Sequence, residues 1–208
     1  MLKNLKTESE IMKYVLASAS PRRKEILENL GLDFVVITSD ADESSNIKDP
    51  EKLTEELSKR KAEAVRDLLD AKGMLDSETV IIASDTVVYA CGEILGKPKD
   101  KSDAERMIRM LSGKTHTVTS GVALICKDKT VSAHSTTKVT FDELDEKFIE
   151  DYISSREPYD KAGAYAIQGR AAEVISKIDG CYFNVVGLPV NKLLRLAKEN
   201  GIPFELNR

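Results

Sequence analysis

Apolar runs and amphipathic segments follow one another along the first half of the chain, and their spacing predicts its strands and helices. Short apolar runs at 14–17, 34–37 and 80–83 predict buried strands, and the last of them is typical of a central strand covered on both faces. Helical spacing of apolar residues predicts a long helix from Pro50 to about Lys72. Its apolar stripe is Leu53, Leu57, Ala64, Val65 and Leu68.

The second half of the chain carries period-two alternation and capping signals. A strand is predicted at 117–126, and the alternation over 130–141 predicts a half-buried antiparallel strand after it. A capping box at 102–105 marks the start of a helix. The remaining predictions are a polar lead-in or first helix at 1–13, a short helix at 145–154, a hairpin of strands at 174–178 and 182–186, and a last helix opened by 187–189.

The stretch 16–27 places a turn of small residues between the first strand and a helix. Ser20 stands at the N-cap position and Pro21 at the first helical position, so backbone N–H groups and the positive end of the helix dipole converge there. Arg22, Arg23 and Lys24 follow in the first turn, where each exposed cation costs about 0.3–1 kcal/mol against the dipole. A bound anion would reverse that sign, so the pattern predicts either a phosphate site or a solvated basic turn.

Charged residues interrupt apolar patterns at two further places. Asp85 follows the buried run at 80–83, and a carboxylate there is expensive to bury without a metal, a cation or a bulge that returns it to solvent. Lys61 falls inside the apolar stripe of the long helix, so it either snorkels to the rim or points into a site. Lys97 precedes Pro98, which fixes the backbone from which its side chain leaves.

Two loops carry other candidate chemistry. The loop at 38–44 holds three carboxylates, Glu43 among them, which are either solvated or shared by a cation. The segment 157–169 combines small residues with tyrosines and charges, and is typical of a structured binding loop. Gln168 lies in it beside a glycine, and an amide can read the edge of a base. Tyr159 and Tyr165 fit either a cleft or the core.

Composition limits the partners of the chain. At 208 residues, with 41% hydrophobic and 32% charged residues, it is one large domain or two closely joined lobes. The net charge of -4 makes nucleic acid a poor partner, although the basic turn keeps that alternative open. An acidic protein that binds a polyphosphate must gather a few cations locally and recruit a metal.

Cysteine and histidine usage excludes some metal and disulfide chemistry. Cys91, Cys126 and Cys181 are far apart, so they are read as reduced, partly buried thiols of a cytoplasmic protein, without a disulfide frame or zinc site. His116 and His134 have no ligand at metal spacing and are expected to be structural or superficial. No apolar run approaches about 18 residues, so no membrane span is expected.

Three stretches together resemble the Maf family, the septum-formation-type nucleotide pyrophosphatases. They are LASASPRR at 16–23, ASDT at 83–86 with GKP at 96–98, and PYDKAGAYAIQG at 158–169. LSG at 111–113 followed by Thr115 and His116, and VGLP at 186–189, also match, and the similarity runs in order from about residue 14 to 200. Each motif alone is weak, whereas the ordered set is specific.

The resemblance implies one α/β domain over 1–208, with an elongated mixed β-sheet flanked by helices and two lobes around a central cleft, as in inosine triphosphate pyrophosphatases. It implies a metal-dependent hydrolase that cuts a nucleoside triphosphate between the α and β phosphates, and a homodimer. The products are a nucleoside monophosphate and pyrophosphate. The alternative is a regulator of septum formation that binds nucleotide without turnover.

The resemblance also assigns site residues. Its phosphate-binding turn matches Ser18, Arg22 and Arg23, and its polar catalytic set matches Glu43, Lys61, Asp85 and Lys97. Asp85 and Glu43 are expected to hold Mg²⁺ or Mn²⁺, with Asp85 as base, ligand or both. Arg22, Thr86 and Gln168 match the positions that mark the subgroup acting on dTTP and UTP, canonical or modified; the 7-methyl-GTP subgroup differs at the latter two.

One departure from the family pattern concerns the strand that carries the aspartate. The family usually has Gly-Ala before it, where this chain has Ala83 and Ser84. The added methyl and hydroxyl groups are expected to crowd a tight strand without removing the Asp-Thr pair.

Overall fold

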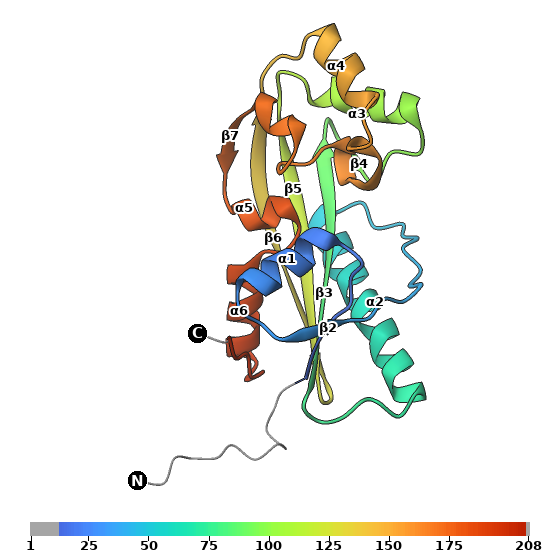
Figure 1. The fold of residues 1–208 in the computed structure, drawn as a ribbon, viewed down its shortest axis with the longest axis vertical. Coiled ribbons are helices and arrows are strands. Elements are labelled where there is room, and N and C mark those ends of the chain that lie inside the picture. The colour runs from blue at the N-terminus through green and yellow to red at the C-terminus, as the bar shows by residue number, and fades with distance from the viewer. Residues whose placement is uncertain (1–12, 207–208) are drawn as a thin grey trace.

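The computed structural model describes residues 13–206, which form one mixed sheet covered by helices (Figure 1). The predicted lead-in or helix at 1–13 lies outside these residues, apart from the backbone of Lys13. The strands are β1 (Lys13–Leu16), β2 (Phe34–Val36), β3 (Thr79–Ala90), β4 (Glu93–Leu95), β5 (Thr115–Cys126), β6 (Lys129–Phe141) and β7 (Ile175–Asp179). Their order in the sheet is β2-β1-β3-β5-β6-β7, with β4 also paired to β3.

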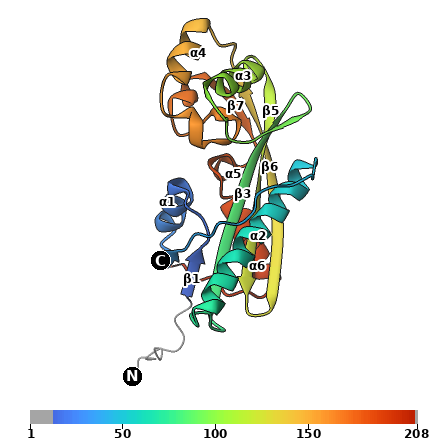
Figure 2. The ribbon, with the colours of Figure 1, turned by 90° about the vertical axis from the view of Figure 1, so that its right-hand side faces the viewer.

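The sheet is mixed because β1 pairs in parallel with β2 and β3, whereas the other pairs are antiparallel. The long strands β3, β5 and β6 run through the whole length of the molecule, which makes it elongated (Figures 1 and 2). The α/β class and the elongated mixed sheet are therefore confirmed.

Helices cover both faces of the sheet. The α-helices are α1 (Pro21–Asn29), α2 (Pro50–Ala71), α3 (Lys101–Leu111), α4 (Glu146–Ile153), α5 (Tyr182–Val186) and α6 (Val190–Glu199), and the 3₁₀ turns are η2 (Pro158–Asp160), η3 (Ala162–Ala164) and η4 (Arg170–Val174). Figure 2 shows α1 and α2 on opposite sides of the sheet, with α3 and α4 together at its far end. Among residues 13–206 no helix is both long enough and apolar enough to cross a membrane.

Alternation along β3 divides the hydrophobic core. Val80 and Ile82 pack in the cluster that includes α1 and α6, whereas Ile81 and Ala83 pack in the cluster that includes α2. All four are fully buried, as the continuous apolar run predicted. A further cluster fills the far end, where Met107 of α3 joins residues of α4, β5 and β6.

The edge of β3 has a gap that positions the site. β1 pairs with β3 only as far as Ile82, and β4 begins to pair at Val88. Residues 83–87 are therefore paired with β5 on one side but have no strand on the other. Asp85 lies in this gap, within a strand that continues through it without a bulge.

Two predictions about strands are wrong. The run at 34–37 is not a buried strand, because β2 is the edge of the sheet and the side chains of Val35 and Val36 are 55% and 43% exposed. The run at 182–186 is the short helix α5 and not the second arm of a hairpin, and β7 pairs with β6 instead. Five residues are too few for periodicity to separate a strand from a helix.

Two details of the helices also differ. Helix α3 begins before the predicted capping box at 102–105. Its N-cap is Asp100, whose side-chain Oδ1 accepts a hydrogen bond from the N–H of Asp103. In α2 the predicted stripe members Ala64 and Leu68 are only half-buried. Their places in the core are taken by Ala62 and Leu69.

Candidate active site

A cavity of about 960 Å³ opens at the gap in the edge of β3. The turn before α1, the loop after β2, α2, β3, the loop after β4, and the segments at 160–167 and 185–187 line it. It contains eight of the predicted site residues, namely Ser18, Arg22, Arg23, Glu43, Lys61, Asp85, Thr86 and Lys97. The tertiary structure thus gathers side chains that are spread over 80 positions of the chain.

Asp85 is held by the cation of α2. The Lys61 Nζ lies 2.6 Å from Oδ1 of Asp85 and 3.1 Å from Oε1 of Glu43. The Asp85 side chain is 9% exposed and that of Lys61 19%, whereas Glu43 is 59% exposed. Among the metal, the cation and the bulge considered for a carboxylate in this apolar strand, the structure has a cation. That cation is Lys61, whose side chain points into the site.

Arg23 of α1 makes hydrogen bonds to the turn before its helix, to β3 and to the segment that follows α5. Its Nε donates to the carbonyl of Gly187 (2.9 Å) and its Nη1 to the carbonyl of Ser84 (2.7 Å). Nη1 also donates to Oγ of Ser18 (3.1 Å), and Nη2 to Oγ1 of Thr86 (3.1 Å). Four of its five N–H groups are therefore engaged. Burial lowers the pKa of Arg23, and nearby carboxylates oppose the shift, so the guanidinium stays charged.

The hydroxyl of Ser18 is directed by these contacts. Its oxygen accepts from the N–H of Ser20 at 3.2 Å and from Arg23 at 3.1 Å. A serine oxygen has two lone pairs, so its own proton remains for an acceptor in the cavity. Ser20 is the N-cap residue of α1, as predicted, but its side chain makes no capping bond.

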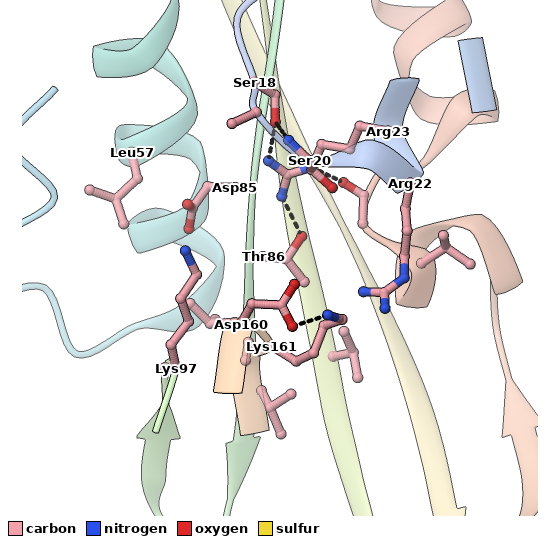
Figure 3. Close-up of a pocket in the computed structure, with 18 of the residues that line it drawn as sticks. Ser18, Ser20, Arg22, Arg23, Leu57, Asp85, Thr86, Lys97, Asp160 and Lys161 are labelled. Carbon is pink, nitrogen blue, oxygen red and sulfur yellow. Dashed lines mark hydrogen bonds and ion pairs between the residues drawn. The ribbon is translucent and has the colours of Figure 1, made fainter. Parts of the chain in front are cut away.

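Arg22 and Lys97 differ from Arg23 because, within residues 13–206, neither makes a hydrogen bond or an ion pair. Figure 3 shows the ammonium of Lys97 pointing toward the carboxylate of Asp85, and the Arg22 guanidinium extending into the cavity. Opposite them, Asp160 and Lys161 form an ion pair with each other. The cavity therefore offers two cations that are free to bind an anion.

Gln168 is placed differently from the other predicted site residues. Its side chain is exposed and does not line the cavity, although its neighbour Ile167 does. Tyr165 lines the cavity and is also buried in the core at 5% exposure, so it has both of the roles left open, whereas Tyr159 packs against the same core cluster and does not line the cavity. The hydroxyl of Tyr159 instead donates to the carbonyl of Ile153 at 2.6 Å.

Both histidines are structural, as expected. His116 is 3% exposed, its Nε2 lies 2.7 Å from the hydroxyl of Tyr165, and burial lowers its pKa to about 4. His134 on β6 lies 2.6 Å from Glu55 and 3.2 Å from Glu51, both on α2. The first supports the cavity wall, and the second fastens the helix that carries Lys61 to the sheet.

The serine that departs from the family pattern has partners of its own. Ser84 is fully buried, and its hydroxyl lies 2.7 Å from the carbonyl of Gly121 and 2.8 Å from that of Gly187. The added hydroxyl therefore links β3 to β5 and to the cavity wall. The residues that sequence reasoning missed lie below the cavity floor, where Ser120 is 2.8 Å from Thr86 and bonds to Asn184. No local motif marks them, because their role depends on pairing across the sheet.

The cysteines are free, but one expectation about their burial is wrong. Cys126 is buried and Cys181 half-buried, whereas Cys91 is exposed. Cys91 lies in the tight turn between β3 and β4, where it has a φ of 52° beside Gly92. A turn at the tip of two strands leaves its side chain in solvent.

The acidic residues of the cavity form a small donor set. Within residues 13–206 no group of three or more histidine, cysteine or acidic side chains is arranged to hold a metal. Glu43 and Asp85 are two carboxylates that share one cation. Such a pair fits a divalent ion that also takes ligands from substrate phosphates and water, which is the usual arrangement for Mg²⁺.

Comparisons with known proteins find sequences similar to this chain over most of its length. The sequence model of one family, described as Maf-like protein, matches residues 13–200. A dTTP/UTP pyrophosphatase of Bacillus anthracis (strain CDC 684 / NRRL 3495) is 44% identical over 191 residues, covering 91% of this chain and 96% of that protein. A dTTP/UTP pyrophosphatase of Thermoanaerobacter sp. (strain X514) is 48% identical over 189 residues, covering 90% and 96%.

Among solved structures, a HAM1 protein from Coxiella burnetii aligns with a TM-score of 0.44 and 13% identity, covering 63% of this chain and 73% of that one. The family match spans nearly all of the described chain, and the relatives are matched over almost their whole length. The range of the family match includes the turn before α1, Asp85 and the segment around Tyr165. The chain therefore belongs to the Maf family.

Proposed function

We propose that this protein hydrolyses dTTP and UTP between the α and β phosphates and releases the nucleoside monophosphate and pyrophosphate. The observation that carries the proposal is the cavity in which Asp85, held by Lys61, lies beside the unpaired cations Arg22 and Lys97. The relatives named dTTP/UTP pyrophosphatase supply the substrate class.

The cations would neutralise the triphosphate. Arg22 can grip a phosphate with two parallel N–H donors, whereas Lys97 supplies a point charge beside Asp85. The free proton of Ser18 would bond a phosphate oxygen. Arg23 is held by protein acceptors, so we assign it to shaping the phosphate turn and not to gripping a phosphate.

Asp85 would orient and deprotonate the attacking water. A general base must lie within hydrogen-bond reach of that water, and Asp85 borders the cavity with one oxygen held by Lys61. Phosphoryl chemistry depends mainly on positioning and charge neutralisation, which this arrangement supplies. Thr86 and Gln168 are proposed to read the pyrimidine, with Gln168 requiring a movement of its exposed side chain toward the cavity.

We propose that Asp85 and Glu43 hold Mg²⁺ or Mn²⁺ together with the substrate phosphates. A divalent ion held there would supply charge neutralisation for the phosphates and would favour deprotonation of water. Lys61 lies between the two carboxylates and keeps them close in its absence.

We further propose that the chain acts as one domain, forms a homodimer and works in the cytoplasm, where its nucleotide substrates occur. The long strands shared by both ends of the molecule support the single domain. Light scattering coupled to size-exclusion chromatography tests the dimer, which predicts a mass near twice 23.0 kDa.

The decisive experiment measures pyrophosphate release from a panel of pyrimidine, purine and 7-methylguanine nucleoside triphosphates with Mg²⁺, Mn²⁺ or EDTA. The proposal expects release from dTTP and UTP that EDTA abolishes. Release only from a purine or methylated guanine nucleotide would keep the chemistry and refute the substrate class. Binding without release would refute the enzyme.

A further inference from the structure

A chain of hydrogen bonds runs beneath the cavity floor from Arg23 to α5. The Nη2 of Arg23 lies 3.1 Å from Oγ1 of Thr86, and that oxygen lies 2.8 Å from Oγ of Ser120. Ser120 in turn lies 2.8 Å from the backbone carbonyl oxygen of Asn184. Each distance is that of a well-formed hydrogen bond.

The two ends of this chain fix its direction. A guanidinium can only donate, and a carbonyl oxygen can only accept. Ser120 has one hydroxyl proton, and the bond to Asn184 uses it. The bond between Ser120 and Thr86 must therefore be donated by Thr86. Turning the Ser120 proton toward Thr86 instead would forfeit the bond to the carbonyl of Asn184.

Asn184 is anchored so that this direction does not reverse. It is fully buried, and its Oδ1 accepts from the N–H of Ser120 at 3.0 Å. Its Nδ2 donates to the carbonyl of Val118 at 2.8 Å and to Oγ1 of Thr137 at 2.9 Å. An amide flip would set its NH₂ group against a backbone N–H and its oxygen against a carbonyl, so the orientation is determined by its neighbours.

These bonds leave the hydroxyl oxygen of Thr86 with one free lone pair. Its proton goes to Ser120, one lone pair accepts from Arg23, and one lone pair is left. Thr86 lines the cavity, so any group that bonds its hydroxyl from the cavity must donate. Ser18 is the opposite case, because both of its lone pairs are taken and it can only donate.

We propose that Ser120 and Asn184 are positioning residues that hold the Thr86 hydroxyl as an acceptor, and that this acceptor selects the N3–H of uracil and thymine. Cytosine has a bare lone pair at N3 and would face the lone pair of Thr86. The inference rests on the proposed hydrolysis of dTTP and UTP and explains why pyrimidines with an imide would be preferred.

The first test compares kcat/KM for UTP and CTP in the wild type and in Thr86→Val, which keeps the shape and removes the acceptor. Losing one hydrogen bond should lower kcat/KM for UTP about tenfold, whereas kcat/KM for CTP should rise, because valine removes the lone pair that faces N3 of cytosine. Equal losses on both substrates would show that Thr86 contacts the sugar or phosphates, and would overturn the inference.

The second test uses Ser120→Ala, which leaves the Thr86 proton without its acceptor and free to turn into the cavity. The ratio of kcat/KM for CTP to that for UTP should rise about tenfold, because Thr86 can then donate to N3 of cytosine. A purely structural role would lower both substrates together and leave the ratio unchanged. Ser120→Thr keeps the hydroxyl and should restore the wild-type ratio.

The matched control is Thr119→Val. Thr119 is the neighbour of Ser120 on β5, is 1% exposed, and bonds a hydroxyl across the sheet, Oγ1 of Thr136 at 3.0 Å, but it is not in the chain to Thr86. Its CTP to UTP ratio should equal that of the wild type. A shift as large as that of Ser120→Ala would refute the inference. Absence of UTP and dTTP turnover in the wild type would refute the proposed function, and this inference with it.

Discussion

Lys61 of α2 reaches Asp85 of β3 with 2.6 Å between Nζ and Oδ1, across 24 positions of the sequence. The ion pair lies where β3 has no neighbouring strand on one side. The carboxylate therefore borders the cavity, although it is largely buried. Its cation makes burial tolerable, because an unpaired carboxylate at this position would be strongly disfavoured. The same contact aims one oxygen and leaves the other for ligand, water or metal.

Asp85→Asn should slow turnover by orders of magnitude without unfolding the protein. The amide keeps an oxygen for Lys61, which also retains Glu43, so the free energy of unfolding should change by less than about 2 kcal/mol. The rate of pyrophosphate release should fall by about 10² to 10⁴, the range for a lost general base. Asp151→Asn, on the exposed face of α4, serves as the control and should keep the wild-type rate. Comparable rates in both variants would remove Asp85 from the mechanism.

Arg22→Ala and Arg23→Ala should show that Arg22 binds substrate and that Arg23 stabilises the fold. Arg22 makes no hydrogen bond or ion pair among residues 13–206, although its charge acts on Asp160, so its loss should change stability by about 0.5 kcal/mol or less and raise KM or lower kcat. Arg23 bonds four acceptors, so its loss should cost about 3 kcal/mol or more. Urea denaturation and steady-state kinetics on both variants test this. If Arg22→Ala unfolds the protein, or Arg23→Ala retains wild-type stability, the two roles are assigned wrongly.

Gly121→Ala should disrupt the packing of α2 on the sheet. A Cβ at Gly121 would overlap the backbone carbonyl of Thr54, so the helix must shift. Overpacking of this kind costs about 1–3 kcal/mol, and activity should fall because α2 carries Lys61. Gly96→Ala, where an added Cβ meets nothing within 4 Å, should leave the melting temperature unchanged. Equal melting temperatures for the two variants would contradict the close packing.

Stability should fall as the pH is lowered through the range set by His116. Burial lowers its pKa from 6.5 to about 4, so between these values the unfolded chain binds a proton that the folded chain does not. This one group should lower the free energy of unfolding by about 2 kcal/mol between pH 7 and pH 5. Urea titrations at both pH values should show the loss in the wild type and a smaller loss in His116→Gln. Identical pH dependence of the two proteins would refute it.

Local patterns determined much of this protein. The continuous apolar run gave the buried part of β3, periodicity gave α2 within one residue at its end, and Pro21 placed the start of α1. The need of Asp85 for a metal, a cation or a bulge also followed from its neighbours, because the energetic cost of burying a charge depends on local polarity.

The tertiary structure decided which partners meet. It paired Lys61 with Asp85. It bonded Arg23 to protein acceptors and left Arg22 without a hydrogen bond among the described residues. It also placed β2 at an edge of the sheet, where its valines are exposed. It also joined Ser120 to Thr86 below the cavity. These outcomes depend on strand order and on the packing of elements far apart in the chain, and a pattern that repeats every two or four residues carries no information about either.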